Sequence, residues 1–123
     1  MLLQIAREDA PAGVTIFRLT GRITLGNSCK ELEWTVEKAV ESGCAKVVID
    51  LNQIERVDSA GVGILTLSAG LLRKAGGQLR ISGAHGFVDD LVKLTKLDTI
   101  IPFHPDVESA IAAFSAPQSA RQA

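Results

Sequence analysis

Residues 46–65 read KVVIDLNQIERVDSAGVGIL, and this stretch decides the fold. It begins within a continuous apolar run, residues 45–51, whose β-branched side chains are typical of a strand covered on both faces in a parallel or mixed sheet. From Ala60 onward the apolar residues recur at helical spacing, and the two glycines at 76 and 77 end that helix. A buried strand followed by an amphipathic helix predicts an α/β protein.

The segments on either side continue the alternation of strands and helices. Strand-like residues 2–8 and 14–20 flank Pro11-Ala12-Gly13, whose turn chemistry predicts an antiparallel hairpin. Ser28 is a good N-cap for a first helix, which ends at Gly43. After the second helix, the predicted elements are a strand at 78–83, a helix at 86–97, a short strand at 99–103 and a helix at 106–114 capped by Asp106.

The resulting order, β-β-α-β-α-β-α-β-α, predicts a single domain over residues 1–114. Its centre is one mixed sheet of four to five strands with about four helices packed on it, and the sequence leaves open whether the helices cover one face or both. In the third helix, Phe87, Val88, Leu91 and Leu94 fall on one apolar stripe. Residues 115–123 are expected to form a flexible tail.

Composition limits the classes of function. The chain has 123 residues, 46% hydrophobic and 22% charged, with a formal net charge of −1. Scattered lysines and arginines give no electrostatic footprint for nucleic acid. The first residues lack the pattern of a signal peptide, and no apolar stretch reaches the ~18 residues of a membrane span. We therefore expect a cytoplasmic protein that neither inserts into a membrane nor binds nucleic acid.

The residues that commonly carry catalysis or bind metals are sparse. Cys29 and Cys44 are too few for a disulfide framework, and His85 and His104 have no neighbours at metal-ligand spacing. Ser59 follows an aspartate, but the sequence places no histidine to act as its base. No glycine-rich phosphate loop with a lysine occurs. The sequence thus favours a binding module without cofactor or metal over an enzyme, with a serine hydrolase using Ser59 as the enzymatic alternative.

The step Asp58-Ser59-Ala60-Gly61 has two interpretations. In the first, Asp58 or Ser59 only caps the second helix. In the second, the Ser59 hydroxyl carries a phosphoryl group, which the start of a helix tolerates. That group would add roughly −1.5 to −2 charge beneath any docked partner. A penalty of about 3 kcal/mol for an uncompensated charge lowers affinity about a hundredfold, so phosphorylation would release the partner.

The second helix carries two apolar faces. Val62, Leu65, Ala69 and Leu72 form one stripe, whereas Ile64, Leu67 and Leu71 cluster on nearly the opposite side. The second cluster is either buried against a neighbouring helix or is a docking surface beside Ser59. Trp34 falls off the apolar stripe of the first helix and is a weaker interface candidate.

Several of these motifs together resemble the STAS domain, the family shared by sulfate-transporter tails and bacterial anti-sigma-factor antagonists. The resemblance runs from about Gln4 to Phe114. The resemblance rests on four segments: VTIFRLTGRIT at 14–24, the stretch at 46–65 with its DSAG step, GGQL at 76–79, and LVKLTKLDTIIPFHPDVESAI at 91–111. The resemblance implies a sheet of four or five strands with helices packed on it, no enzymatic activity, and a reversible protein-binding switch.

In the antagonist branch of the family, the serine after the motif aspartate is phosphorylated by the partner, a kinase that doubles as an anti-sigma factor. Ser59 matches that serine. The resemblance implies that the unphosphorylated domain binds the kinase and frees the sigma factor, and that a phosphatase restores the complex. The predicted partner-binding residues are Thr24, Asp58, Ser59, Ala60, Gly61, Val62, Gly63, Ile64, Leu67 and Leu71.

One position departs from the family pattern. Many phospho-switch antagonists carry an aspartate where this chain has Thr24, so Thr24 or Ser28 is expected to supply a hydroxyl to the same surface instead. The alternative function is a stand-alone STAS adaptor, a subunit of a stress-signalling scaffold or of an ABC lipid-transport complex. The oligomeric state stays open.

Overall fold

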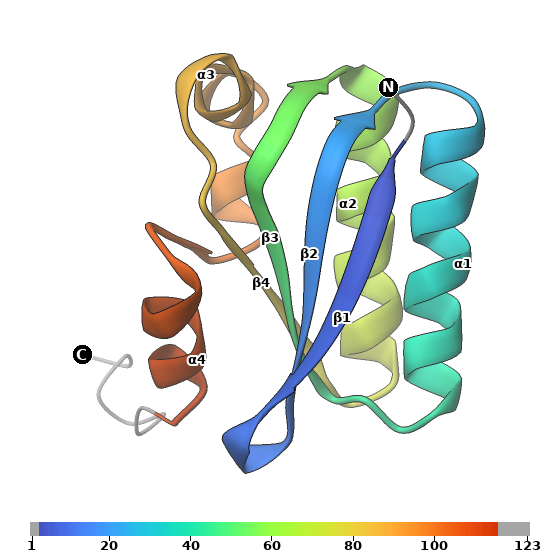
Figure 1. The fold of residues 1–123 in the computed structure, drawn as a ribbon, viewed down its shortest axis with the longest axis vertical. Helices are drawn as coiled ribbons and strands as arrows, with labels where there is room; N and C mark the ends of the chain where they lie inside the picture. The colour runs from blue at the N-terminus through green and yellow to red at the C-terminus, as the bar shows by residue number, and fades with distance from the viewer. Residues whose placement is uncertain (1–2, 116–123) are drawn as a thin grey trace.

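Five strands form one mixed sheet in the order β1-β2-β3-β4-β5 (Figure 1). A computed structural model describes residues 3–115 of the chain. The strands are β1 (Gln4–Ala10), β2 (Val14–Ile23), β3 (Lys46–Val57), β4 (Gln78–Ser82) and β5 (Phe103–His104). β1 pairs antiparallel with β2 through the turn at Pro11–Gly13, and the other neighbours pair in parallel. The predicted hairpin, the mixed sheet and the central strand are confirmed.

Helices cover both faces of this sheet. They are α1 (Asn27–Glu41), α2 (Ser59–Lys74), α3 (Gly86–Leu94) and α4 (Val107–Ser115), with a short 3₁₀ helix, η2, at Leu97–Thr99. α1 and α2 lie side by side on one face, α4 packs on the other, and α3 contacts β3 (Figure 1). The sequence left open whether helices cover one face of the sheet or both, and the structure shows that they cover both.

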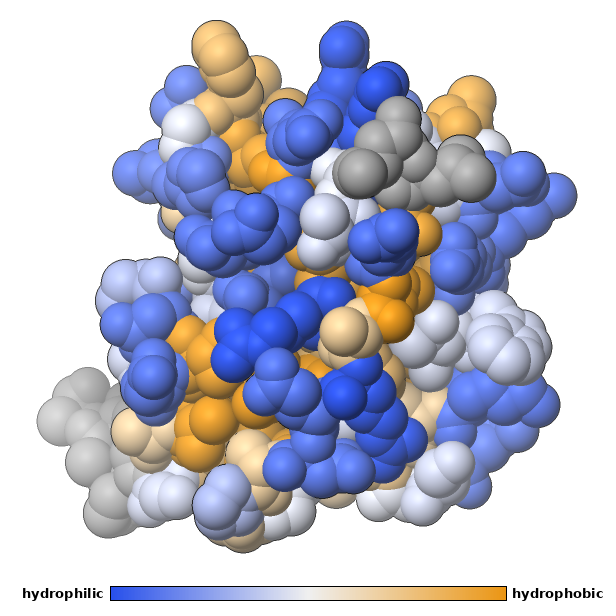
Figure 2. Space-filling model, viewed as in Figure 1, coloured by the Kyte–Doolittle hydropathy of each residue, from blue (hydrophilic) through white to orange (hydrophobic). Residues whose placement is uncertain are grey.

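The alternation of side chains along β2 and β3 builds two cores. Phe17, Leu19 and Ile23 point toward α1 and α2, where they join the main core. Val14 and Ile16, one residue out of phase with these, pack with Val48 beneath α4. Beyond α4 the same face is open and carries mostly hydrophilic side chains (Figure 2).

Several local predictions need correction. The third helix ends at Leu94 and not at residue 97, because Lys96 takes a left-handed conformation, and the strand expected at 99–103 is limited to β5. Ser28 is not the N-cap of α1: the cap is Gly26, and the Ser28 hydroxyl accepts from the Thr24 N–H (2.9 Å) and donates to the Thr24 carbonyl (2.7 Å). The central strand does not stop at residue 51, because pairing with β2 continues to Val57. The expected apolar stripe of α3 is only partly buried, since Phe87 is 88% and Leu94 79% exposed.

The buried face of α3 is instead formed by Val88 and Val92, four residues apart. At the C-terminus, the Asp106 carboxylate accepts a hydrogen bond from the Ser109 N–H (2.8 Å), as its predicted capping role requires. Ser115, the first residue of the expected tail, is the last residue of α4, and residues 116–123 lie outside the described residues.

Candidate functional site

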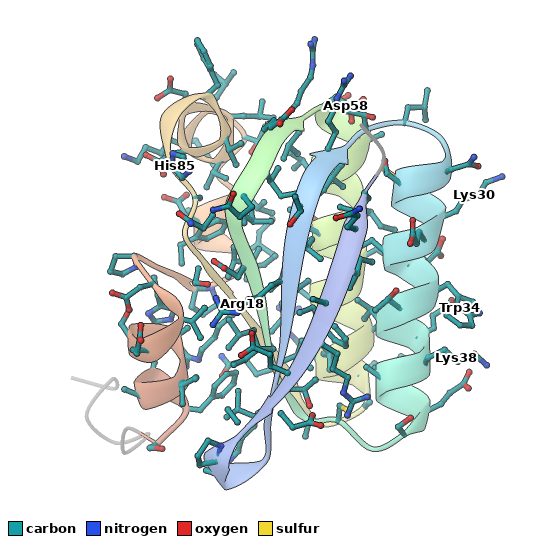
Figure 3. All side chains as sticks on the ribbon, in the orientation of Figure 1. Arg18, Lys30, Trp34, Lys38, Asp58 and His85 are labelled. Atoms are coloured by element: carbon teal, nitrogen blue, oxygen red, sulfur yellow. The ribbon has the colours of Figure 1, made fainter. Side chains whose placement is uncertain are left out.

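The candidate site lies where β2 and β3 end and α2 begins, at the end of the sheet marked by Asp58 (Figure 3). Asp58 is the N-cap of α2. One of its carboxylate oxygens accepts from the Gly61 N–H (2.9 Å) and the other from the Leu25 N–H (3.0 Å). Its own N–H donates to the Ile23 carbonyl (3.3 Å). One carboxylate thus joins the loop before α1 to the first turn of α2.

The surroundings of Asp58 keep it ionised. Partial desolvation acts to raise the pKa of this carboxyl, but hydrogen bonds from the backbone N–H groups of Leu25, Gly61 and Ala60 outweigh it and leave the pKa below its ordinary value. The negative charge is therefore present at neutral pH and is already engaged by backbone donors.

Ser59 is the first residue of α2 and is exposed. Within residues 3–115 its hydroxyl makes no hydrogen bond, because the capping role has gone to the residue before it. Of the two residues that the sequence offered as caps, Asp58 is the one used. The Ser59 hydroxyl is therefore exposed to solvent, and the backbone that carries it belongs to the first turn of α2.

The two glycines that follow have different surroundings. A Cβ added to Gly61 would lie 2.3 Å from the Ile23 carbonyl oxygen and 2.8 Å from a Val57 methyl carbon. Glycine at 61 therefore allows α2 to begin in contact with the end of β2. A Cβ on Gly63 would meet nothing within 4 Å, so this residue only leaves the outer surface of the helix flat.

The second apolar face of α2 is mostly covered. Ile64 is buried and Leu71 half-buried in the main core. This agrees with the interpretation that the cluster is buried against a neighbouring helix, because α1 packs beside α2 on the same side of the sheet. Leu67 alone of the cluster is open, with 43% exposure. Of the predicted surface, Gly61 and Ile64 are therefore buried. Ser59, Gly63 and Leu67 are exposed, and the half-buried members are Thr24, Asp58, Ala60, Val62 and Leu71.

Sequence reasoning missed several exposed apolar side chains, among them Leu25 and Phe87. Leu25, 83% exposed, projects from the loop that Asp58 holds, and Phe87 stands at the start of α3. Loops carry no periodicity, so no pattern in the sequence pointed to Leu25. Trp34 does face outward from α1 with 60% exposure, and the Lys38 ammonium lies 5.5 Å from its ring centre (Figure 3).

Neither histidine is hydrogen-bonded to Ser59 among residues 3–115. His85 is hydrogen-bonded to the Asn52 carbonyl (3.0 Å), and His104 contacts Arg80 (3.1 Å). Burial, together with the Asp58 and Glu33 charges, raises the pKa of the Cys29 thiol, which donates to the Thr24 carbonyl. Among residues 3–115 no three potential ligands gather to hold a metal ion. No helix in that range is long and apolar enough to cross a membrane.

A family model described as the STAS domain matches residues 7–110. The chain belongs to the STAS family. BtrV of Bordetella bronchiseptica is 29% identical over 106 residues, which are 86% of this chain and 90% of that relative. The anti-sigma F factor antagonist of Paenibacillus polymyxa is 26% identical over 112 residues, 90% of this chain and 94% of the relative. Both are named as anti-sigma factor antagonists.

Solved structures share the fold. The crystal structure of an anti-sigma factor antagonist from Mycobacterium paratuberculosis superposes with a TM-score of 0.80 at 24% identity, covering 93% of this chain and 95% of that one. The STAS arrangement of one mixed sheet with helices on it, expected from the sequence motifs, is confirmed.

Proposed function

We propose that this protein is an anti-sigma factor antagonist, a protein-binding switch that sequesters a kinase-type anti-sigma factor. Membership of the STAS family and the names of the two relatives support this assignment. In the proposed cycle the unphosphorylated protein holds the anti-sigma factor, phosphorylation of Ser59 releases it, and a phosphatase restores the first state. The protein acts by binding in the cytoplasm and catalyses no reaction itself.

The observation that carries the proposal is the separation of roles between Asp58 and Ser59. Asp58 takes the capping bonds, and Ser59 keeps an exposed hydroxyl without a partner among the described residues. A kinase can therefore reach Ser59 without unwinding α2. In the transfer, the Ser59 oxygen forms a bond to the terminal phosphorus of the kinase's nucleoside triphosphate, the bond to the leaving diphosphate breaks, and the hydroxyl proton is lost to a base of the kinase.

Release follows from electrostatics at the docked surface. We infer that the partner covers Thr24 together with Ser59, Val62, Gly63 and Leu67, the last four of which follow one another at helical spacing along α2. A phosphoryl group beneath it carries roughly −1.5 to −2 charge. Desolvating that charge without a partner costs about 3 kcal/mol, which corresponds to a loss of about a hundredfold in affinity.

Intact-mass spectrometry on the protein purified from its own cells tests the proposal, with peptide mapping across residues 57–67. We expect one phosphate on Ser59 under growth or stress conditions, and none in the variant Ser59→Ala. A serine that is unmodified under all conditions would contradict the switch and favour a constitutive STAS adaptor.

Capture of partners separates the two functions further. The Ser59→Ala protein is expected to retain a soluble protein with a kinase fold, and the variant Ser59→Asp to lose it while remaining folded. Recovery of a membrane permease with its ATPase would support the adaptor of a lipid-transport complex. Covalent labelling of Ser59 by a fluorophosphonate would refute the non-enzymatic role, because that reagent reports an activated serine nucleophile.

A further inference from the structure

A buried arginine lies beneath α4, on the face of the sheet opposite α1 and α2 (Figure 1). Arg80 of β4 is 3% exposed, and its register partner on β3 is Val48, which packs against α4. Its guanidinium donates to the Gln78 side-chain oxygen (3.2 Å) and lies 4.9 Å from the ring centre of Phe114. Because Phe114 belongs to the last turn of α4, this cation–π contact connects that helix to the sheet.

The same guanidinium contacts a histidine of the edge strand. His104 of β5 pairs in register with Ser82 of β4, and its Nε2 atom lies 3.1 Å from an Arg80 nitrogen. A guanidinium only donates hydrogen bonds, so in this contact Nε2 carries the lone pair and the proton of the neutral ring is on Nδ1. One arginine thus joins β4, β5 and α4 while His104 is neutral.

The charges around His104 come from the elements that pack against β5. β4 carries Arg80, α4 carries Glu108, and the loop between β5 and α4 carries Asp106. Burial and the Arg80 charge lower the pKa of His104, and the Asp106 charge opposes them in part. Asp106 is already engaged, because its carboxylate accepts from the Ser109 N–H (2.8 Å) and hydroxyl (2.7 Å). The folded protein therefore favours the neutral form of His104.

We propose that protonation of His104 detaches α4 from the sheet, and that Arg80 couples the two events. Protonation replaces the lone pair on Nε2 with an N–H bond, so the hydrogen bond from Arg80 is lost and two cations face each other. When Arg80 moves away from the imidazolium, its contact with the Phe114 ring weakens as well. Detachment of α4 exposes an apolar strip of the sheet, which consists of Val14, Ile16 and Val48. This inference goes beyond the proposed function, because it involves neither Ser59 nor a partner.

Amide hydrogen exchange of the full chain, followed by NMR, tests the inference. Protection factors, which correct for the intrinsic effect of pH on exchange, report how often each segment opens. The amides of Ala110 and Ile111 in α4 should be less protected than those of Leu65 and Leu72 in the core side of α2, because α4 opens without global unfolding. Protection of α4 should fall from about pH 7.5 to about pH 5. The full decrease is tenfold for each pH unit between the pKa values of His104 in the docked and detached states.

Matched variants assign the effect to His104. In His104→Gln the amide oxygen still accepts hydrogen bonds but does not titrate, so the protection of α4 should lose this dependence on pH. His85→Gln is the control, because His85 is the exposed N-cap residue of α3 and contacts the Asn52 carbonyl (3.0 Å); it should leave the decrease unchanged. Phe114→Leu keeps an apolar side chain but removes the ring, so α4 should open more often at either pH.

Two results would overturn the inference. One is equal protection of α4 and the core side of α2 in the parent protein, because α4 would then be released only when the whole domain unfolds. This comparison needs no variant, so it holds even where a substitution prevents folding. The other is a decrease on acidification that persists in His104→Gln, because another group would then control the helix. The measurements use neither phosphorylated protein nor a kinase, so failure of the switch at Ser59 would leave their outcome unchanged.

Discussion

Replacing Asp58 and Ser59 in turn by alanine should give opposite results, although the residues are adjacent. Asp58→Ala removes the N-cap bond from Gly61, worth about 1 kcal/mol. It also removes the bond from the Leu25 N–H, worth about 1 kcal/mol at this partly exposed position. The sum, about 2 kcal/mol, lowers the unfolding midpoint by about 8 °C in a domain of this size. Ser59→Ala removes no bond and should change the free energy of unfolding by less than about 0.5 kcal/mol.

Urea unfolding followed by circular dichroism at 25 °C measures both changes. Asp58→Asn is the matched control, because asparagine also caps helices but brings no charge, so it should recover about half of the loss. If Ser59→Ala is as destabilising as Asp58→Ala, then the Ser59 hydroxyl supports the helix and the separation of roles is wrong.

The pH dependence of the Asp58→Ala effect provides a second check. The pKa of Asp58 is lower in the folded protein than in the unfolded chain, so the unfolded state binds the proton more tightly. The stability contributed by Asp58 is therefore fully present above about pH 4 and is lost as the pH falls through the folded pKa. The difference between parent and variant should be constant from pH 5 to 7 and should shrink toward pH 3. A difference that grows on acidification would contradict this reasoning.

Two further predictions concern the glycines of α2 and His104. Gly61→Ala should destabilise the folded protein by about 1 to 3 kcal/mol, because the added Cβ would overlap the Ile23 carbonyl. Gly63→Ala should stabilise it by about 0.5 to 1 kcal/mol, because the added Cβ meets no other group at this helical position. Thermal unfolding compares the two variants, and equal effects would refute the close approach of Gly61 to Ile23. Burial and the Arg80 charge lower the pKa of His104, so stability should fall as the pH drops below about 6.5. His104→Gln should flatten that slope between pH 7.5 and 5, and a slope that persists would assign it to other groups.

Periodicity in the sequence was sufficient for the order of the elements. The apolar run before Leu51 and the helical spacing after Ala60 each reflect which side chains a strand or a helix buries, so both elements could be predicted without the structure. The DSAG step was identified correctly as the start of α2, with Asp58 as one of its two possible caps.

The errors have physical causes that local patterns do not contain. An apolar stripe says which residues share a face of a helix, but of the residues of α3 only Val88 and Val92 are buried, and Phe87 stays in solvent. Residues 52–57 have no simple alternation because the register of β3 against β2 shifts twice, once between Asp50 and Gln53 and again at Glu55, and this hides the continuation of β3. Leu25 was missed because its position depends on a hydrogen bond to Asp58, 33 residues further along the chain.

The two edges of the sheet bear on how copies of the protein meet one another. β1 forms one edge and presents Arg7, Glu8 and Asp9 in succession, while β5, at the other edge, is only two residues long. Charged or very short edge strands are poor templates for adding another strand. Neither edge therefore favours growth into fibrils by strand addition, even in the crowded conditions of a cell.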